Sequence, residues 1–342
     1  MMEVALINEQ RKTEWESFID GNPYAIAWQS YEWKEVLKRH FKFDYYPIAV
    51  YDSARIVGVL PLYCMKTMLA KDSLISVPYA VAGGIVSDSE EARDLLVGKA
   101  IELSRENNSC GIVLKQYKIR MEGDFLTDNN YYNRELNISR NPDEIFGGFS
   151  DRNKQMIDLT AKDSHVLEYP SDDLSGFFRL LLRHLHARGV PCVSKRWIED
   201  LIRFKMYAIA LLRSNGHTVA GTMVKEFKKT VSFPFTCLRV GTEPDSRMAY
   251  RLYWELIRHF SGKGFEICHS GRIPNNDMTD DYRIGWGGKK HGYYYQYYPN
   301  RAEKMEYATK RGSKRKILER CWKLVPAPVA EVIGPMVVKR FP

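Results

Sequence analysis

The chain has 342 residues, 44% hydrophobic and 27% charged, which is ordinary for a globular protein long enough for two domains. Its net charge of +9 favours an anionic partner such as RNA, the phosphates of coenzyme A or an acidic membrane surface, although solubility alone would also explain it. No run of about 18 apolar residues and no signal peptide is present, which excludes a membrane-spanning chain and makes a cytoplasmic protein the expectation. The six cysteines are scattered without a CxxC or Cys/His cluster, so we expect no metal site.

The first half of the chain predicts a series of alternating helices and strands. Apolar residues at helical spacing predict two helices, and a change to strand-like patterning then predicts a hairpin around the turn "DSAR". Ser89 is a candidate N-cap for a third helix. In chain order the series is helix 13–23, helix 30–41, hairpin 45–66, strands within 73–87, helix 89–106 and strand 110–117.

The second half repeats that order after a long connection. Its hairpin carries the turn "SNGH", whose Asn-Gly pair is a strong hairpin signal. The series is helix 172–189, helix 194–205, hairpin 207–227, strand 230–240, helix 246–264 and strand 265–270. This repetition indicates an internal duplication of an α+β unit. The aromatic run "HGYYYQYYPN" follows at 291–300 and is interpreted as a closing core strand, with a base-stacking surface as the alternative.

Several motifs, in order, resemble the Fem-type branch of the GNAT acyltransferases. They are "PIAVYDSARIVGVLPLY", "SVPYAVAGGIV", "HARGVPCVSKRWIEDL", "GHTVAGTMV" and "HSGRI" followed by "DDYRIGWGG". The ending "CWKLVPAPVAEVIGPMVVKRFP" is similar to that of the Fem-like proteins encoded beside exosortase and exopolysaccharide genes. The resemblance extends from about Trp15 to Pro342.

The resemblance implies two tandem GNAT-like domains, each a mixed β-sheet flanked by helices. We expect an N-terminal domain at 1–150, a C-terminal domain at 151–310 and a basic, amphipathic tail at 311–342. The implied reaction is attack of an amine or hydroxyl on an activated acyl group, with aminoacyl-tRNA or acyl-CoA as donor and no tightly bound cofactor. The implied acceptor is a precursor of the cell envelope or of an exopolysaccharide.

The donor depends on a loop that holds phosphates in ordinary GNAT enzymes. That loop follows the pattern Gln/Arg-x-x-Gly-x-Gly/Ala, so that backbone N–H groups at a helix start bind pyrophosphate. The second half offers "LRVGTEPDSRMA", which keeps Arg239 but places Glu243 and Asp245 where an anion would bind. We therefore favour aminoacyl-tRNA or another donor without coenzyme A, and retain Arg239 as a substrate-binding candidate.

The polar stretch 269–290 is the first candidate site. Acyl transfer builds negative charge on the carbonyl oxygen and requires the nucleophile to lose a proton. Arg272 and Arg283 could hold an anionic group or the oxyanion, and Asp281 or its neighbour Asp280 could deprotonate an amine. Tyr282 could protonate the leaving group, and Ser270 borders the pocket that the resemblance implies. The alternative is structural, with the carboxylates as helix caps or ion-pair partners and Tyr282 packed; "MTDDYRIGWGG" is interpreted as helix-like.

Two further segments supply candidate substrate-binding residues. In "SVPYAVAGG", Gly83 and Gly84 would let a ligand approach the backbone, and Tyr79 could bind an acceptor, unless the segment is a β-bulge with a packed tyrosine. In "SDRNKQMIDLTAK", which resembles an Arg-rich helix of the family, Arg152 and Lys154 would meet phosphates, unless they lie on a solvated face. His184 and His186 are expected on a helix surface.

The C-terminal tail predicts contact with a membrane surface. It joins the basic run "KRGSKRK" to a proline-punctuated apolar end, which suits the inner, anionic face of a membrane. The alternative is a helix packed on the protein body. A binding protein without catalytic activity is the alternative to the transferase as a whole.

Overall fold

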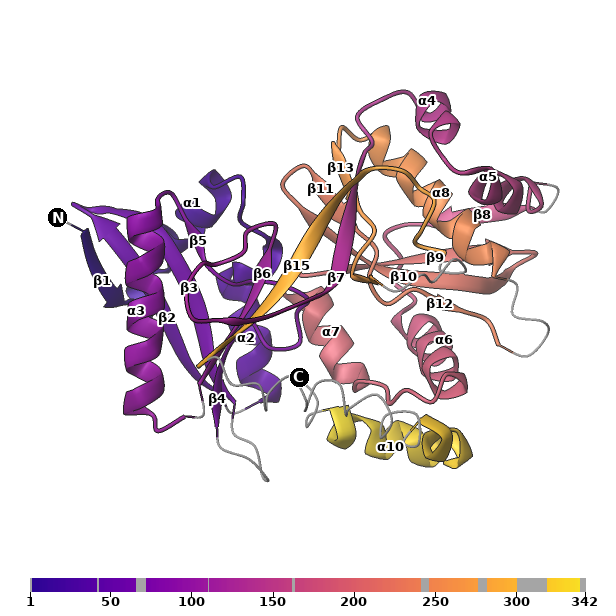
Figure 1. The fold of residues 1–342 in the computed structure, drawn as a ribbon. Coiled ribbons are helices and arrows are strands. Elements are labelled where there is room, and N and C mark those ends of the chain that lie inside the picture. Colours follow the sequence, from indigo (N-terminus) through magenta and orange to yellow (C-terminus); the bar gives the residue numbers. More distant parts are fainter. Residues whose placement is uncertain are drawn as a thin grey trace. The chain divides into compact units, whose positions relative to one another are not determined.

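The computed structural model describes residues 2–41, 43–65, 72–109, 111–161, 164–240, 246–275, 282–299 and 319–338. They belong to two compact units (Figure 1). The first unit is built from Met1–Tyr131 and Gly292–Lys310, and the second from Tyr132–His291 and Arg311–Phe341. The chain therefore passes from one unit to the other more than once, whereas the predicted ranges 1–150 and 151–310 assume a single passage.

The first unit follows the predicted order of elements. Ser89 caps its long helix as expected, because its hydroxyl accepts a hydrogen bond from Ala92 N at 3.1 Å. The elements are β1 (Met2–Leu6), α1 (Lys12–Gly21), α2 (Tyr31–His40), β2 (Asp44–Asp52), β3 (Arg55–Met65), β4 (Ser73–Ser76), β5 (Val86–Ser87), α3 (Glu90–Glu106) and β6 (Ile112–Tyr117). Short 3-10 helices lie at Glu9–Arg11 and Ala27–Gln29.

The sheet of the first unit runs in the order β1-β2-β3-β4-β6-β15, where β15 is Lys289–Tyr298. All neighbours are antiparallel except β4 and β6, which are parallel. Helix α3 covers one face of this sheet, with α1 and α2 on the other (Figure 1). Leu96 and Ala100 of α3 pack with Leu60 and Leu114 of the sheet in one fully buried core, which is the main hydrophobic stabilisation of this unit.

The second unit repeats these elements and adds others. Asn215 and Gly216, both with positive φ, form the predicted hairpin turn. The elements are β7 (Leu126–Asn137), α4 (Pro142–Gly147), α5 (Asp151–Asp158), β8 (His165–Glu168), α6 (Leu174–Ala187), α7 (Lys195–Arg203), β9 (Ala208–Ser214), β10 (His217–Phe227), β11 (Thr230–Ser232), β12 (Cys237–Leu238), α8 (Arg247–Ser261), β13 (Ile267–His269), β14 (Ile273–Pro274) and α10 (Ala327–Val338). The strand expected at 230–240 is instead two short strands separated by Phe233–Thr236.

The sheet of the second unit has the same pattern of directions as the first. Its order is β8-β9-β10-β11-β13-β7, and only β11 and β13 are parallel neighbours. Helices α5 and α8 cover one face, and α6 and α7 cover the other (Figure 1). The predicted α+β class and the predicted duplication are confirmed, because each unit has a six-stranded order with a single parallel pair in the corresponding place.

The last strand of each sheet comes from the other half of the chain. In the first unit, Tyr293–Tyr298 of β15 pairs with β6, and in the second, Glu135–Asn137 of β7 pairs with β13. Tyr293 and Tyr295 of β15 are buried, so the interpretation of 291–300 as a core strand is confirmed. The two halves thus exchange a strand, which a division of the sequence near residue 150 would not indicate.

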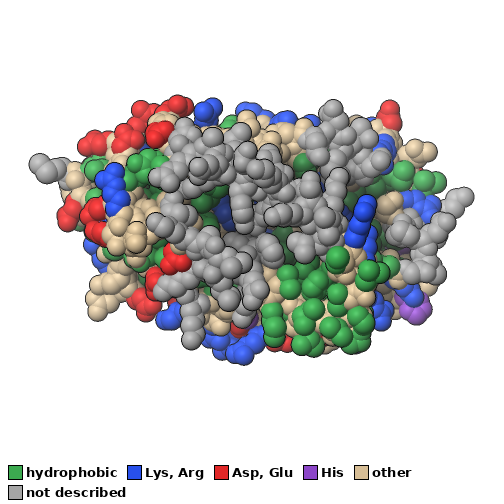
Figure 2. Space-filling model, turned by 60° about the horizontal axis from the view of Figure 1, so that its bottom comes forward, with side chains coloured by type: hydrophobic (Ala, Val, Ile, Leu, Met, Phe, Trp, Pro, Cys, Tyr) green, Lys and Arg blue, Asp and Glu red, His purple; other side chains and the backbone are tan. Residues whose placement is uncertain are grey.

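Helix α10 lies at the C-terminal end of the described chain and packs on α6. Several of its hydrophobic side chains face solvent, in the green area at the lower right of Figure 2. Of the helices in the described ranges, none is both long and apolar enough to cross a membrane.

Candidate functional site

Ser270 joins the end of β13 to β7. Its N–H donates to Arg134 O at 3.1 Å, and its hydroxyl accepts from Arg134 N at 2.9 Å. The amide oxygen of the fully buried Asn133 accepts from Ser270 Oγ and from Gly271 N, at 3.2 and 3.1 Å. Ser270 therefore shapes the segment that carries Arg272, with its own hydroxyl already engaged in the protein.

The two predicted arginines of the segment meet through the backbone. Arg283 Nη1 donates to the carbonyl oxygen of Arg272 at 2.6 Å, and Arg283 is partly buried while Arg272 is exposed. The structure thus brings the guanidinium of Arg283 to the backbone of Arg272. A guanidinium held in this way suits an anionic substrate group or a developing oxyanion.

Tyr282 is packed against the core of the second unit. Its ring meets the buried Tyr253 edge to face, with centroids 5.4 Å apart, and its carbonyl accepts from Trp286 Nε1 at 2.6 Å. Burial raises the pKa of Tyr253 well above its ordinary value, and the charge of Arg283 opposes that rise. Asp281 and Asp280 lie outside the described residues, so the carboxylates of this segment stay predictions.

Residues 282–288 form a loop whose backbone conformation relies on its glycines. The prediction of a helix-like segment is therefore wrong for this described part. Gly285, Gly287 and Gly288 all have positive φ, a conformation that no α-helix contains. The carbonyl of Gly285 accepts from Ser150 N at 2.8 Å, and that of Ile284 accepts from Asn153 Nδ2 at 3.0 Å. The start of α5 therefore holds the loop in place.

The polar side chains of helix α5 lie on two sides of the helix. Asn153 is buried against the loop, whereas Arg152 is exposed. Lys154 Nζ donates to the carbonyl of Gly147 at 2.8 Å, and Lys154 also lines a hollow of about 520 Å³ together with Asp151 and Asp158. Lys154 is thus directed to the end of α4, and its proposed contact with phosphate stays a prediction.

A carboxylate between two histidines lies beside Ser270, and the sequence analysis missed it. Glu135 on β7 contacts His269 Nε2 at 3.1 Å and His291 Nε2 at 3.2 Å. The Glu135 side chain is 13% exposed and each histidine 18%. Glu135 and His269 are direct partners in the β7–β13 ladder. The three residues lie far apart in the sequence, so only the strand exchange could have revealed the group.

In the first unit, the segment of Tyr79, Gly83 and Gly84 is bound tightly to its surroundings. The N–H groups of both glycines donate to Lys115 O at 3.0 Å. A Cβ on Gly83 would lie 2.9 Å from Val77 Cβ, and one on Gly84 would lie 2.5 Å from Gln116 Oε1. These glycines therefore allow close internal packing.

Tyr79 takes part in a stack of aromatic rings. Its ring lies parallel to that of Phe41 with centroids 4.3 Å apart, and Phe41 stacks on Phe43 at 5.1 Å. Tyr79 has a positive φ of 62°, as does Val77 with 47°, and both values are unusual for residues other than glycine. Burial raises the pKa of Tyr79, so its hydroxyl stays protonated at neutral pH.

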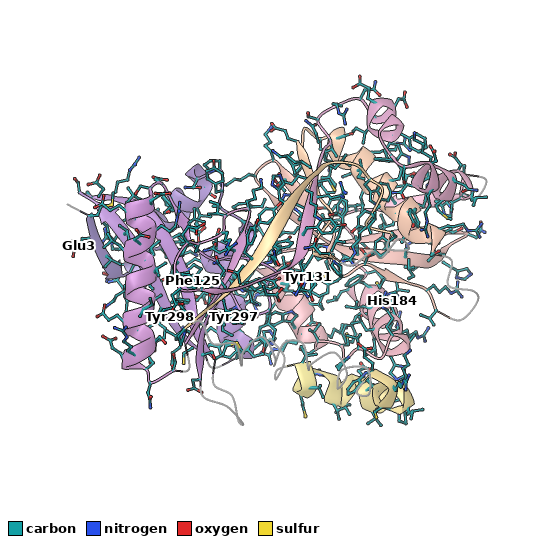
Figure 3. All side chains as sticks on the ribbon, in the orientation of Figure 1. Glu3, Phe125, Tyr131, His184, Tyr297 and Tyr298 are labelled. Carbon is teal, nitrogen blue, oxygen red and sulfur yellow. The ribbon has the colours of Figure 1, made fainter. Side chains whose placement is uncertain are left out.

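Arg239 follows strand β12. The backbone N–H groups of Leu238 and Arg239 both donate hydrogen bonds within the protein. Arg239 N donates to Val219 O at 2.9 Å, and Leu238 N donates to His184 Nδ1 at 3.2 Å. His184 lies on α6 (Figure 3), and burial lowers its pKa, which keeps the nitrogen available as an acceptor. Both histidines lie on helix α6 and are partly exposed, as expected, and His186 Nε2 also contacts Val325 O at 2.7 Å.

The larger hollow described in the first unit, about 690 Å³, contains no predicted site residue. It lies around the turn between β2 and β3 and the end of α1, with Asp52, Arg55 and Asp88 among its lining residues. Ser270, Arg272, Tyr282 and Arg283 of the second unit instead gather around 270–272 and 282–288, beside β7 and α5. This group of residues is the candidate site.

Comparison with known proteins shows the fold. No family model and no curated protein matches the chain. The structure of FemX matches 87% of this chain and 98% of its own, with TM-score 0.67 and 14% identity. A domain described as the C-terminal part of a lysylphosphatidylglycerol synthetase from Agrobacterium fabrum matches 90% of this chain and 96% of its own, with TM-score 0.59 and 12% identity. A tandem GNAT protein from the clavulanic acid biosynthesis pathway matches 86% and 98%, with TM-score 0.53 and 10% identity.

These similarities confirm the predicted architecture of two tandem GNAT-like domains, each with a mixed sheet flanked by helices. They extend over nearly the whole length of each neighbour. Identity of 14% or less shows the fold alone.

Proposed function

We propose that this protein transfers an acyl or aminoacyl group to an amine or hydroxyl of a cell-envelope or exopolysaccharide precursor, as a Fem-like protein of the exosortase-associated branch. The observation that carries the proposal is the match to FemX along 98% of that chain. A fold hosts more than one function, so the candidate site must supply the chemistry.

The guanidinium of Arg283 supports this reaction. The nucleophile would attack the acyl carbon, the bond from that carbon to the donor oxygen or sulfur would break, and the carbonyl oxygen would carry negative charge in between. Arg283, held by the backbone of Arg272, would stabilise that charge. Asp281 would accept the proton that the nucleophile loses, and Tyr282 would return a proton to the leaving group.

We propose aminoacyl-tRNA as the donor and keep acyl-CoA as the alternative. The net charge of +9 suits a polyanion. The N–H groups of Leu238 and Arg239 donate within the protein, so they are not open to a pyrophosphate. Glu243 and Asp245 would repel one at close range.

The decisive experiment offers the purified protein separate pools of labelled aminoacyl-tRNA and labelled acyl-CoA, together with an extract of lipid-linked and nucleotide-linked envelope precursors. We expect label to move from tRNA to a precursor, and to move at least about tenfold more slowly with Arg283→Ala. Arg55→Ala is the matched control, because Arg55 is an exposed arginine on the first unit, paired with Asp88.

Calorimetric titration with coenzyme A separates the two donors. We expect no binding at micromolar concentration. Micromolar binding that Arg239→Ala abolishes would overturn the choice of tRNA and make the protein an acyl-CoA-dependent transferase.

A binding protein without activity is the second candidate, and the occupied N–H groups of Leu238 and Arg239 favour it. It would recognise a glycan precursor or an assembly partner. Transfer of label from neither pool, together with measurable binding of a precursor, would support this candidate over the transferase.

We also propose that the reaction takes place at the inner face of the membrane, where a lipid-linked acceptor would be found. The neighbour described as a lysylphosphatidylglycerol synthetase supports a lipid-borne acceptor in this fold. Contact with the membrane needs a surface suited to it.

A further inference from the structure

The outward side of helix α10 and the end of the helical segment 319–324 before it expose aliphatic side chains. Leu324 is 84% exposed, Val332 66%, Met336 64% and Val329 46%. Figure 2 shows a hydrophobic area in the region of α10. Exposed aliphatic side chains gathered in this way are costly in water and indicate a surface that becomes covered.

The opposite side of the same helix is fixed to the second unit. Ala330 is 1% exposed, and a Cβ on Gly334 would lie 2.9 Å from Cys192 O. The carbonyl of Val325, just before the helix, contacts His186 Nε2 at 2.7 Å. The exposed side chains therefore point outward from a docked helix, in a fixed orientation.

The spacing of the residues makes this face continuous. Val329, Val332 and Met336 are three and four positions apart and share one side of the helix, whereas Ala330 and Gly334 share the other. The only charged residue in Ala327–Val338 is Glu331. The helix thus has one apolar face for the protein and a second apolar face for an external partner.

The chain around this face is strongly basic. Residues 174–198, on which the helix packs, contain five basic residues and no acidic one: Arg179, Arg183, Arg188, Lys195 and Arg196. Residues 319–323, which lead into the helix, contain two basic residues, Arg320 and Lys323, and one acidic residue, Glu319. The partner must therefore present apolar material together with negative charge.

We infer that the outward face of α10 is an interfacial membrane anchor, which lies flat in the headgroup region of an anionic bilayer. Its aliphatic side chains would enter the boundary of the acyl chains, and the surrounding lysines and arginines would contact the anionic headgroups. A helix of 12 residues spans about 18 Å, which suits a helix in the plane of the surface. A second copy of the chain would bring two basic surfaces together, and RNA would leave the aliphatic side chains exposed.

Vesicle flotation of the full-length protein tests this anchor without measuring transfer, so its outcome is independent of the proposed reaction. We expect binding to vesicles that contain phosphatidylglycerol and much weaker binding to pure phosphatidylcholine. Raising the salt concentration should weaken the binding. The double variant Val332→Ser/Met336→Ser should lower the affinity for the anionic vesicles by about tenfold or more, with unchanged circular dichroism because both residues face solvent.

The matched control is Val166→Ser on β8, which removes a valine that is 60% exposed from a different surface, and it should leave vesicle binding unchanged. A chain ending at Glu319 should lose the binding as well. The inference is overturned if Val332→Ser/Met336→Ser binds anionic vesicles as well as the unmodified protein. It is also overturned if the double variant dissociates a dimer, or if it weakens binding to tRNA while vesicle binding is absent.

Discussion

Gly271 and Gly285 have the same backbone handedness, with φ of 80° and 88°, but different surroundings. A Cβ on Gly271 would meet nothing within 4 Å, whereas one on Gly285 would lie 2.7 Å from Asn153 Oδ1 and would also contact Ser150. At Gly271 a side chain meets only the strain of a positive φ, and at Gly285 it also disturbs the contact between the loop and α5. The backbone conformation of the candidate site is therefore sensitive to a single added Cβ atom at Gly285, and less so at Gly271.

The pair of glycines gives a direct test of that dependence. Gly285→Ala should lower the free energy of unfolding by about 3 kcal/mol, and Gly271→Ala by about 1 kcal/mol, since strain alone accounts for roughly the smaller amount. Urea denaturation of both variants measures the difference. Equal losses would show that the loop moves away from Ser150 and Asn153 without cost.

Arg283 has both a structural and a proposed chemical role. Arg283→Ala removes the hydrogen bond to Arg272 O, which should cost about 1 kcal/mol of stability for a partly exposed group. The same change should weaken substrate binding by about tenfold or more while the protein stays folded. Titration of the substrate found in the transfer assay, with thermal unfolding in parallel, separates the two roles. A loss of stability with unchanged affinity would make Arg283 a structural residue only.

Helices α1 and α2 are joined by a hydrogen bond to a partly buried carboxylate. Glu16 of α1 accepts a hydrogen bond from the backbone N–H of Tyr31 at the start of α2. Burial raises the pKa of Glu16 from 4.5 to about 7, and the neighbouring charge of Glu32 contributes to that rise. This group therefore titrates near neutral pH although it lies far from the candidate site in the sequence.

The stability of the protein should consequently fall as the pH rises from about 5 to 7. The folded protein holds the Glu16 proton more tightly than the unfolded chain, so each step toward the ionised carboxylate favours unfolding. We expect a loss of about 1 kcal/mol, less than the full shift would give because the side chain is partly exposed. Glu16→Gln should remove this part of the pH dependence in denaturation curves at pH 5 and 7. Parallel curves for the two proteins would contradict the assignment.

Helix α3 contains a glycine that its packing does not require. A Cβ on the exposed Gly98 would meet nothing within 4 Å, and alanine is favoured over glycine inside a helix by about 1 kcal/mol. Gly98→Ala should therefore raise the free energy of unfolding by about that amount in urea denaturation. Gly58→Ala is the contrasting variant, because its Cβ would lie 3.2 Å from Leu96 Cδ1 and should destabilise the protein.

Helices and turns that carry a local sequence signal, such as a cap or an Asn-Gly pair, were predictable. Segments whose conformation is fixed by contacts with residues distant in the sequence were not. Ser89 marks the start of α3, and Asn215-Gly216 marks the hairpin between β9 and β10. The loop at 282–288 belongs to a segment predicted to be helix-like, but its glycines adopt positive φ to fit against α5 and β7. No local pattern in 282–288 contains that information.

The whole molecule follows the predicted duplication, but the exchange of β7 and β15 was not predictable from one sequence. The aromatic pattern showed that 291–300 is a strand, whereas its partner, β6, lies more than 170 residues earlier. The His269–Glu135–His291 group was missed for the same reason. Of the candidate site, the sequence indicated Ser270, Arg272 and Arg283, and the supporting residues Asn133, Ser150 and Asn153 became visible only through tertiary contacts.

The first unit should consequently need its distant strand in order to fold. Gln296 of β15 is fully buried, and its amide bonds both the N–H and the carbonyl of Met121, at 2.7 and 2.8 Å. A fragment of residues 1–131 should therefore lack a cooperative unfolding transition, and the same fragment joined to residues 292–310 by a flexible linker should regain one. Circular dichroism during urea denaturation measures both. Cooperative unfolding of the shorter fragment would contradict this.

The strand exchange also has a consequence for synthesis on the ribosome. Strand β6 ends at Tyr117, but its partner β15 ends only at Tyr298, so about 180 further residues must be translated before the first sheet is complete. At roughly 5–20 residues per second, the nascent chain would hold an unpaired edge of β6 for about 10–35 s. An open strand edge invites pairing with other chains, so the growing polypeptide should depend on chaperones during that interval, and slowing translation within residues 118–291 should lower the yield of soluble protein.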